Sequence, residues 1–339
     1  MGGTSGVKDV LAQVVKDVLA LYSSGAEEPA SDEICSAPEV PPTYLRCLGT
    51  SVSHPLWNFK SLEKFLESVI EEHMAAREKP ASGDDLYSRV DYRRFVAWPK
   101  RIRREAPFLM EVLEKAPTRS VIDLGCGTGE HCRFLAGKGF AAVGLDRSES
   151  MLAKAQEQPL PPNLRFVLAE LQQVREAVKT QFGAAISLGN TLVHLTRRQD
   201  LEEAFASLVQ VLEPRGLILF QILNYERIFE GNIRHLPLSF RQHEDGEIVF
   251  LRLMEPLEDG WVRFCPTTLK YDPQADPPVE VVRSRVVELR GWRREDLIPL
   301  LENAGFSILS VHGDLIGGLY QPRTSHDLVL VAQNMKDRE

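Results

Sequence analysis

Three glycines and one aspartate near the middle of the chain have the spacing of a nucleotide-binding turn. Gly125, Gly127 and Gly129 follow the apolar run 121–124, which is typical of a buried parallel strand. Glycine lets the backbone turn tightly and approach a ligand closely. Asp146 ends the next apolar run, where a carboxylate can hold ribose hydroxyls. The spacing therefore predicts a βαβ unit that binds a nucleoside-containing ligand.

The position of the third glycine distinguishes between such ligands. A dinucleotide fingerprint, G-x-G-x-x-G, would place that glycine at residue 130. The chain has Glu130 there, and its glycine comes one residue early, at Gly129. This spacing disfavours a nicotinamide-dependent oxidoreductase.

The residues around the turn resemble class I S-adenosylmethionine-dependent methyltransferases. The resemblance is carried by D-L-G-C-G-T-G at 123–129, by Leu145-Asp146, and by Ser148-x-x-Met151-Leu152. It implies S-adenosylmethionine as the cofactor and an α/β, Rossmann-like fold, with a seven-stranded, mostly parallel sheet whose last strand is antiparallel. It also assigns cofactor contacts to seven residues here: Gly125, Cys126, Gly127, Gly129, Asp146, Arg147 and Met151.

Hydrophobic periodicity predicts the elements that position these residues. Apolar runs bounded by turn residues predict strands at 121–124, 140–145, 164–168, 182–187, 217–223, 306–312 and 327–332. Helical spacing predicts helices at 131–137, 148–156, 200–212 and 293–304, and a turn at Glu213–Gly216 leads into the fifth strand.

Two later strand ends extend the resemblance. Glu170 and Leu171 stand where the family has an acidic residue for the adenine amino group and an apolar neighbour, although glutamate is longer than the usual aspartate. The stretch from Leu188 to Leu195, L-G-N-T-L-V-H-L, resembles L-G-N-S-x-x-H-L of glycine N-methyltransferase-like enzymes. The resemblance implies that Leu188 borders the sulfonium, and that Asn190 and His194 face the reacting centre or hold the loop.

His194 has two interpretations. An imidazole titrates near neutral pH, so it could take a proton from the methyl acceptor. Alternatively, it forms hydrogen bonds within the loop and shapes the pocket. The second is favoured, because a neutral amine acceptor needs no strong base.

The residues before the first strand of the sheet add three further candidates. Enzymes that this chain resembles carry a tyrosine and a tryptophan that close over the cofactor, and an arginine for its carboxylate; Tyr87, Trp98 and Arg101 stand at these positions. Aromatic faces attract a sulfonium cation, and a guanidinium binds a carboxylate. Tyr87 would also orient the methyl group. The alternative is a core aromatic pair beside a solvated basic helix face.

Acceptor contacts are expected after the fifth strand. Asn224 and Tyr225 leave its carboxyl end, where open α/β sheets bind ligands. Residues 225–290 show the period-two patterns of strands. We expect an antiparallel insertion that covers the site, with Arg252 among its substrate contacts.

The predicted organisation has three parts. Residues 1–84 form an N-terminal helical extension with a flexible linker, including amphipathic helices at 7–22 and 61–76. These helices pack on their own domain or form a homodimer contact. Residues 85–224 and 291–339 form the cofactor-binding domain, and 225–290 the inserted lid.

Composition excludes several classes of protein. A net charge of −8 disfavours a nucleic-acid binder. No apolar run approaches the ~20 residues that span a bilayer, so no membrane partner is expected. Five cysteines without a C-x-x-C pair indicate a reducing compartment and no metal site. We therefore expect a cytoplasmic protein.

Together these observations predict methyl transfer from S-adenosylmethionine to the nitrogen or oxygen of a small molecule. The acceptor atom would attack the sulfonium methyl in line, so the protein's task is mainly to position the reactants. Two alternatives stay open: a catalytically silent S-adenosylmethionine-binding protein and a nucleic-acid methyltransferase. The latter would call for a basic face and an N-P-P-Y-like loop, which the acidic chain and Leu188-Gly-Asn190 do not provide.

Overall fold

The computed structural model describes residues 96–243, 246–272, 274–275 and 279–336. Tyr87 and the helices expected at 7–22 and 61–76 lie outside these residues. The chain divides into two compact units. Of the described residues, the first unit contains 96–233, 254–264 and 286–336, and the second contains those in 234–253 and 265–285.

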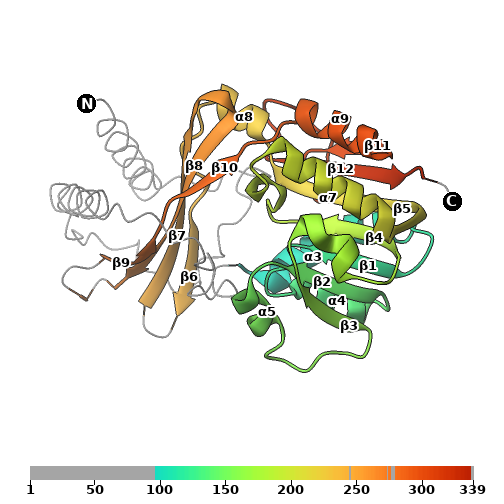
Figure 1. The fold of residues 1–339 in the computed structure, drawn as a ribbon. Helices are drawn as coiled ribbons and strands as arrows, with labels where there is room; N and C mark the ends of the chain where they lie inside the picture. The colour runs from blue at the N-terminus through green and yellow to red at the C-terminus, as the bar shows by residue number, and fades with distance from the viewer. Residues whose placement is uncertain (1–95, 244–245, 273, 276–278, 337–339) are drawn as a thin grey trace. The chain divides into compact units, whose positions relative to one another are not determined.

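A seven-stranded sheet organises the first unit, in the order β11-β12-β5-β4-β1-β2-β3 (Figure 1). Its strands are β1 Ser120–Leu124, β2 Ala141–Asp146, β3 Leu164–Leu168, β4 Phe182–Ser187, β5 Leu212–Leu223, β11 Phe306–His312 and β12 Asp327–Asn334. Strands β1 to β5 pair in parallel, while β12 is antiparallel to both β5 and β11. The expected fold, with an antiparallel last strand, is confirmed.

Helices α4 Glu130–Gly137, α5 Glu149–Ala155, α6 Val174–Ala177 and α7 Arg198–Val211 connect the parallel strands. In addition, α3 Trp98–Leu113 precedes β1, α8 Tyr225–Glu230 follows β5, and α9 Arg294–Ala304 precedes β11. The helices predicted from the periodicity correspond to α4, α5, α7 and α9. Short 3-10 turns are η3 Leu171–Gln173, η4 Leu192–His194 and η5 Glu258–Gly260. Ser148 caps α5 by accepting from the Met151 N–H at 3.1 Å, and Gly305 ends α9 with φ 105°.

Helices cover the sheet on both faces, because alternate residues of a strand point to opposite sides. On one side, Leu219 of β5 belongs to an apolar cluster with Leu109 of α3 and Leu135 of α4. On the other, Phe220 stacks on Phe205 of α7 with ring centroids 5.6 Å apart. Strands buried on both faces explain the nearly continuous apolar runs in the sequence.

The start of β5 differs from the sequence prediction. Glu213–Gly216 was expected to be a turn, yet the strand begins at Leu212 and includes these residues. Arg215 has φ 62°, and the β4–β5 register shifts between Phe182 and Ala184. The β4–β5 pairing passes from Leu212 to Leu217 and skips the turn residues, which therefore form an irregularity within a longer strand.

A second, antiparallel sheet is formed by the later part of the chain, in the order β10-β8-β7-β6, with β9 paired to β8. Its strands are β6 Ser239–His243, β7 Gly246–Pro256, β8 Trp261–Tyr271, β9 Val279–Ser284 and β10 Val287–Arg290. The antiparallel insertion expected here is therefore present. Among the described residues, no helix has the length and apolarity needed to cross a membrane.

Candidate active site

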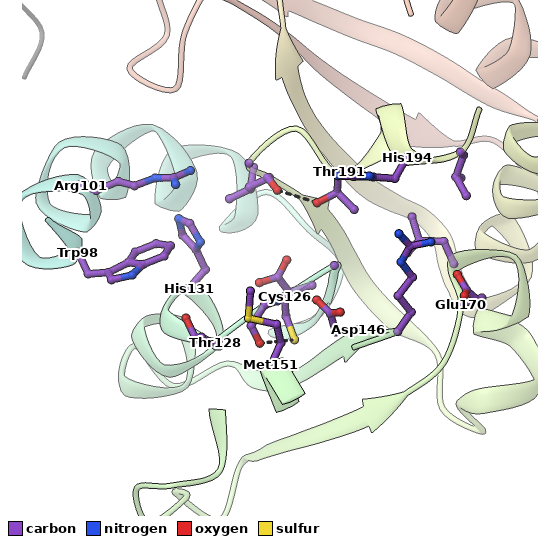
Figure 2. A pocket seen from close by; sticks show the side chains of 18 residues that line it. Trp98, Arg101, Cys126, Thr128, His131, Asp146, Met151, Glu170, Thr191 and His194 are labelled. Carbon is purple, nitrogen blue, oxygen red and sulfur yellow. Dashed lines mark hydrogen bonds between the residues drawn. The ribbon is translucent and has the colours of Figure 1, made fainter. Parts of the chain in front are cut away.

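A pocket lies at the carboxyl ends of the parallel strands, next to the start of α3 (Figure 2). Figure 2 shows Trp98, Arg101 and His131 together at one side, with Glu170 and His194 at the other. The residues around it include eleven of the predicted cofactor contacts and one predicted catalytic residue: Trp98, Arg101, Gly125, Cys126, Gly127, Asp146, Arg147, Met151, Glu170, Leu171 and Leu188, with His194. Segments distant in sequence thus meet at one edge of the sheet.

The glycines of the turn have different tasks. All three have positive φ: 76° at Gly125, 54° at Gly127 and 79° at Gly129. A Cβ on Gly125 would come within 2.3 Å of Thr191 Cγ2, and one on Gly129 within 2.5 Å of Phe166 Cζ. A Cβ on Gly127 would meet no atom within 4 Å. Gly127 therefore leaves open space for a ligand, while Gly129 is outside the pocket lining and permits helix–sheet packing.

Asp146 ties the turn to the end of β2. Its Oδ2 accepts a hydrogen bond from the Gly127 N–H at 2.8 Å, and its Oδ1 accepts one from the Ser148 N–H at 2.9 Å. Only 9% of the residue is exposed. A carboxylate oxygen accepts more than one hydrogen bond, so Asp146 can also receive ligand hydroxyls while it holds the turn.

A carboxyl group and two thiols, those of Asp123, Cys126 and Cys132, lie close together at the glycine turn. Asp123 Oδ2 accepts a hydrogen bond from the Cys132 Sγ–H at 3.4 Å. Burial raises the pKa of Asp123 to about 6, against the opposing effect of nearby His131. Burial also raises the pKa of Cys126 to about 11, so this thiol stays neutral near pH 7. The group packs the floor of the pocket and contains no reactive thiolate.

At the α3 end, Arg101 lies against the Trp98 ring. Its Cζ is 5.1 Å from the ring centroid, which is within the range of a cation–π contact. Both residues border the pocket. The alternative interpretation, a core aromatic pair beside a solvated helix face, does not account for this position. A guanidinium here can receive a carboxylate.

The opposite end is formed by residues 188–195. Gly189 and Asn190 both have positive φ, 74° and 72°. The Gly189 N–H donates to Gln221 Oε1 at 2.7 Å, and Trp292 Nε1–H donates to the Leu195 carbonyl at 2.9 Å. These contacts present Leu188 and His194 to the pocket.

Besides Gly129, three described residues that were predicted for catalysis or acceptor binding and belong to the first compact unit lie outside the pocket lining. Asn190 Nδ2 donates to the Tyr225 hydroxyl at 3.0 Å, while its Oδ1 accepts from the Leu223 N–H at 2.9 Å. Tyr225 is 1% exposed. Asn224 caps α8 by accepting from the Arg227 N–H, and its Nδ2 donates to the carbonyls of Pro322 and Ser325. The structure gives all three roles in holding the loops.

Arg252 belongs to the second compact unit, on strand β7. Its Nη2 donates to the Pro237 carbonyl at 2.8 Å, and its guanidinium is 5.9 Å from the Phe250 ring. Its substrate role stays a prediction, as does that of Tyr87.

Several pocket residues were not predicted: Asp123, Thr128, His131, Gly189, Thr191 and Leu195. All of them are neighbours in sequence of residues that were. Asp123 and Thr128 belong to the quoted glycine motif, and Thr191 lies within the quoted loop. His131 carried a weaker signal, because a histidine in the first turn of an amphipathic helix is equally compatible with a core position.

The chemistry of the pocket fits S-adenosylmethionine. An amino-acid carboxylate needs a cation, and Arg101 borders the pocket. A ribose and an adenine amino group each need an acceptor, and the carboxylates of Asp146 and Glu170 also border it. The open space at Gly127 leaves room for close approach to the backbone.

Comparison with known proteins agrees with this reading of the pocket. Residues 121–216 match the family model described as a methyltransferase domain. The chain carries a class I S-adenosylmethionine-dependent methyltransferase domain. The resemblance found in the glycine turn is confirmed, and S-adenosylmethionine is the cofactor of this class.

Two relatives extend the match beyond the domain. Glycine/sarcosine N-methyltransferase of Parasynechococcus marenigrum is 30% identical over 181 residues, covering 53% of this chain and 64% of that enzyme. The enzyme of the same name from Aphanothece halophytica is 27% identical over 221 residues, covering 65% of this chain and 78% of that enzyme. The chain thus spans slightly less than two thirds of the first relative.

A solved structure supports the fold. The CcbJ methyltransferase from Streptomyces caelestis superposes with a TM-score of 0.59 at 20% identity, covering 74% of this chain and 97% of that chain. At this identity the likeness concerns the fold of the methyltransferase domain and leaves the acceptor undefined.

Proposed function

We propose that this chain is an enzyme that transfers a methyl group from S-adenosylmethionine to a small-molecule acceptor. One observation carries the proposal: Arg101, Asp146 and Glu170, from three separate segments, border a single pocket beside the glycine turn. The match of residues 121–216 to methyltransferase domains supports it.

Each part of the cofactor has a candidate partner. Arg101 would bind the carboxylate, with Trp98 and Tyr87 closing over the methionine part. Asp146 would hold the ribose hydroxyls, and Arg147 and Met151 would border the nucleoside. Glu170 would accept from the adenine amino group, with Leu171 beside the ring. Leu188 would contact the region of the sulfur.

When bound, S-adenosylmethionine supplies an electrophilic methyl group. The chain's part is to orient an acceptor toward it and to exclude water. His194 stands at the side of the pocket opposite Arg101 (Figure 2), and Leu188 also lines the pocket, which suits both residues to border the acceptor. Asn190 and Tyr225, which bond to each other at 3.0 Å, would fix this wall.

We propose an amine nitrogen as the acceptor atom. Support comes from the names of both relatives, which are glycine/sarcosine N-methyltransferases. A neutral amine has its own lone pair, so His194 would orient the acceptor and need not act as a strong base. Arg252 is the candidate for an acidic group on the acceptor.

The remaining sequence predictions join this proposal. Residues 85–224 with 291–339 would be the cofactor domain and 225–290 the lid. The N-terminal helices of residues 1–84 would form a homodimer contact, and the protein would be cytoplasmic and independent of nucleic acid. The amphipathic spacing of apolar residues supports the helices, and the absence of a C-x-x-C pair in the sequence supports the cytoplasmic location. The net charge of −8 supports independence of nucleic acid.

The test combines binding with turnover. Isothermal titration should show S-adenosylmethionine binding to the folded full chain. Incubation with glycine, sarcosine and other small amines should then release S-adenosylhomocysteine and give a product heavier by one methyl group, detected by mass spectrometry. An alcohol and a carboxylic acid panel controls for oxygen acceptors.

The outcomes separate the alternatives. Absence of cofactor binding would overturn the assignment of the pocket. Binding without turnover on any acceptor would favour the catalytically silent protein, and methylation confined to the oxygen panel would overturn the choice of nitrogen.

A further inference from the structure

A buried carboxylate stands directly behind the pocket without being part of its lining. Glu105 lies on α3, one helical turn after Arg101, and is 2% exposed. Acidic side chains are almost never fully buried unless they are paired. Its partners therefore indicate its task.

Glu105 connects two residues of the pocket wall. Its Oε1 accepts from Arg101 Nε–H at 2.9 Å, and its Oε2 is 2.9 Å from His131 Nε2. His131, in the first turn of α4, is 6% exposed. One carboxylate thus joins two helices at the same end of the pocket.

The connection closes through Trp98. The His131 and Trp98 rings meet edge to face, with centroids 5.5 Å apart and an interplanar angle of 87°. Arg101 in turn lies 5.1 Å from the Trp98 centroid. Four side chains therefore form a ring: Trp98, Arg101, Glu105 and His131 (the first, second and fourth are visible in Figure 2).

The electrostatics keep Glu105 ionised within this ring. Burial by itself raises the pKa of the carboxyl, but the hydrogen bond with His131 and the charge of Arg101 outweigh burial and lower the pKa overall. A charge-assisted hydrogen bond of this kind is stronger than a neutral one. The Arg101 guanidinium is consequently held at its Nε edge.

We propose that Glu105 is a positioning residue for cofactor binding: it holds Arg101, and through His131 also Trp98, in the arrangement that receives the carboxylate end of S-adenosylmethionine. The inference rests on the proposed function. An arginine side chain has many rotamers, and fixing it before the ligand arrives lowers the entropy lost on binding.

Removing the charge of Glu105 could either raise or lower the affinity for S-adenosylmethionine, and the direction distinguishes two roles. Removing a negative charge near the ligand's carboxylate would by itself tighten binding, since like charges repel. Loss of positioning would weaken it. The two roles therefore predict opposite results for a substitution that removes the charge and keeps the shape.

The main variant is Glu105→Gln. Titration should show S-adenosylmethionine binding about tenfold weaker than in wild type, the loss expected for a weakened charged hydrogen bond. Binding of 5′-methylthioadenosine, which has the nucleoside and sulfur but no carboxylate, should not change. Glu111→Gln is the matched control, because Glu111 lies on the same helix, is 67% exposed, forms an ion pair with Lys115 at 3.0 Å and is not part of the pocket lining.

A double-mutant cycle tests whether Glu105 acts through Arg101. In an Arg101→Ala background, Glu105→Gln should cause almost no further loss of S-adenosylmethionine affinity, because the group that it positions is absent. A general structural role would give additive losses, with both ligands weakened in each variant.

His131 supplies a second route if Glu105→Gln does not fold, as judged by circular dichroism. His131→Phe retains a ring beside Trp98 and loses the contact with Glu105, so it should weaken S-adenosylmethionine binding. His131→Gln can still donate to Glu105 and should bind more tightly than His131→Phe.

The failures are distinguishable. If wild type binds neither ligand, the proposed function is wrong. If wild type binds S-adenosylmethionine, and Glu105→Gln (or His131→Phe) binds it equally well or better, the positioning role is wrong and the proposed function stands. Equal losses for both ligands would also overturn the positioning role.

Discussion

At the α3 end of the pocket, the stabilising contacts join side chains to one another. At the end formed by residues 188–195, side chains distant in sequence form hydrogen bonds with the backbone of the loop. The first set includes the Arg101–Glu105 contact, between residues one helical turn apart. The second includes Gly189 to Gln221 and Leu195 to Trp292. The α3 end therefore positions a charged group, whereas the 188–195 end fixes the conformation of a loop.

The difference teaches how the two ends can be changed. A helix brings residues four apart onto one face, so the α3 end depends mainly on local structure. The 188–195 end depends on strands and loops that meet only in the folded sheet. We therefore expect changes at the first end to affect cofactor binding and changes at the second to affect acceptor use.

The largest effect is expected at Asp146, which lies between the two ends. Asp146→Ala removes acceptors for the Gly127 and Ser148 N–H groups as well as for the ribose. Cofactor affinity should fall on the order of a thousandfold, about 4 kcal/mol, from the loss of two or more charge-assisted hydrogen bonds. Titration measures this. Exposed Glu149→Gln is the control, and a loss below tenfold would contradict the role of Asp146.

Two aspartates, one near each end of the pocket, allow the ends to be compared through the pH dependence of folding stability. Burial raises the pKa of Asp123, below the glycine turn, and of Asp327, which accepts from Gln221 behind the loop, to about 6 each. The unfolded chain releases these protons near pH 4, so stability falls as pH rises from about 4 to 6 and stays lower above it.

Asp123→Asn and Asp327→Asn should therefore each raise stability at pH 7.5, by up to about 3 kcal/mol. The gain should nearly vanish at pH 4, where the folded-state carboxyl is protonated and the unfolded-state carboxyl is about half protonated. Urea unfolding at both pH values measures it. A gain equal at both values would show that ionisation is not its cause.

Gly125 joins the turn to the 188–195 loop. Gly125→Ala places a Cβ within 2.3 Å of Thr191 Cγ2 at φ 76°, so it should destabilise by about 2 kcal/mol. Gly127→Ala, with no such neighbour, should cost about 1 kcal/mol. Thermal unfolding compares them. Adding Thr191→Ser removes the clashing methyl and should restore part of the stability; no restoration would locate the strain elsewhere.

The smallest effect should be confined to the 188–195 end. Trp292→Phe keeps the ring and removes the hydrogen bond to the Leu195 carbonyl, which costs about 1 kcal/mol. Acceptor KM should rise while cofactor affinity stays unchanged. Trp261→Phe is the matched control, because both rings contact Arg290. The Arg290 Cζ atom is 5.7 Å from the Trp261 centroid and 5.4 Å from the Trp292 centroid. Equal changes in both variants would remove the distinction between the ends.

The positions of the strands along the chain, and most of the residues that line the pocket, were predictable from the sequence. Apolar runs located the strands, and the glycine motif with Asp146 and Glu170 located their functional ends. Asn190, Asn224 and Tyr225 were correctly associated with this edge of the sheet, yet their side chains bond to one another or to nearby loops. Their burial depends on packing that no local pattern encodes.

Local chemistry therefore indicated an α/β fold and a nucleoside-containing ligand, because strand periodicity, closely spaced glycines and a carboxylate at a strand end act over a few residues. The resemblance of the motif to methyltransferases then narrowed the ligand to S-adenosylmethionine. Tertiary structure alone decided which side chains face the pocket. Glu105 and Gln221 look like ordinary polar residues of a helix and a strand in the sequence. They hold the two ends of the site because folding buries them, and a buried polar group must find a partner.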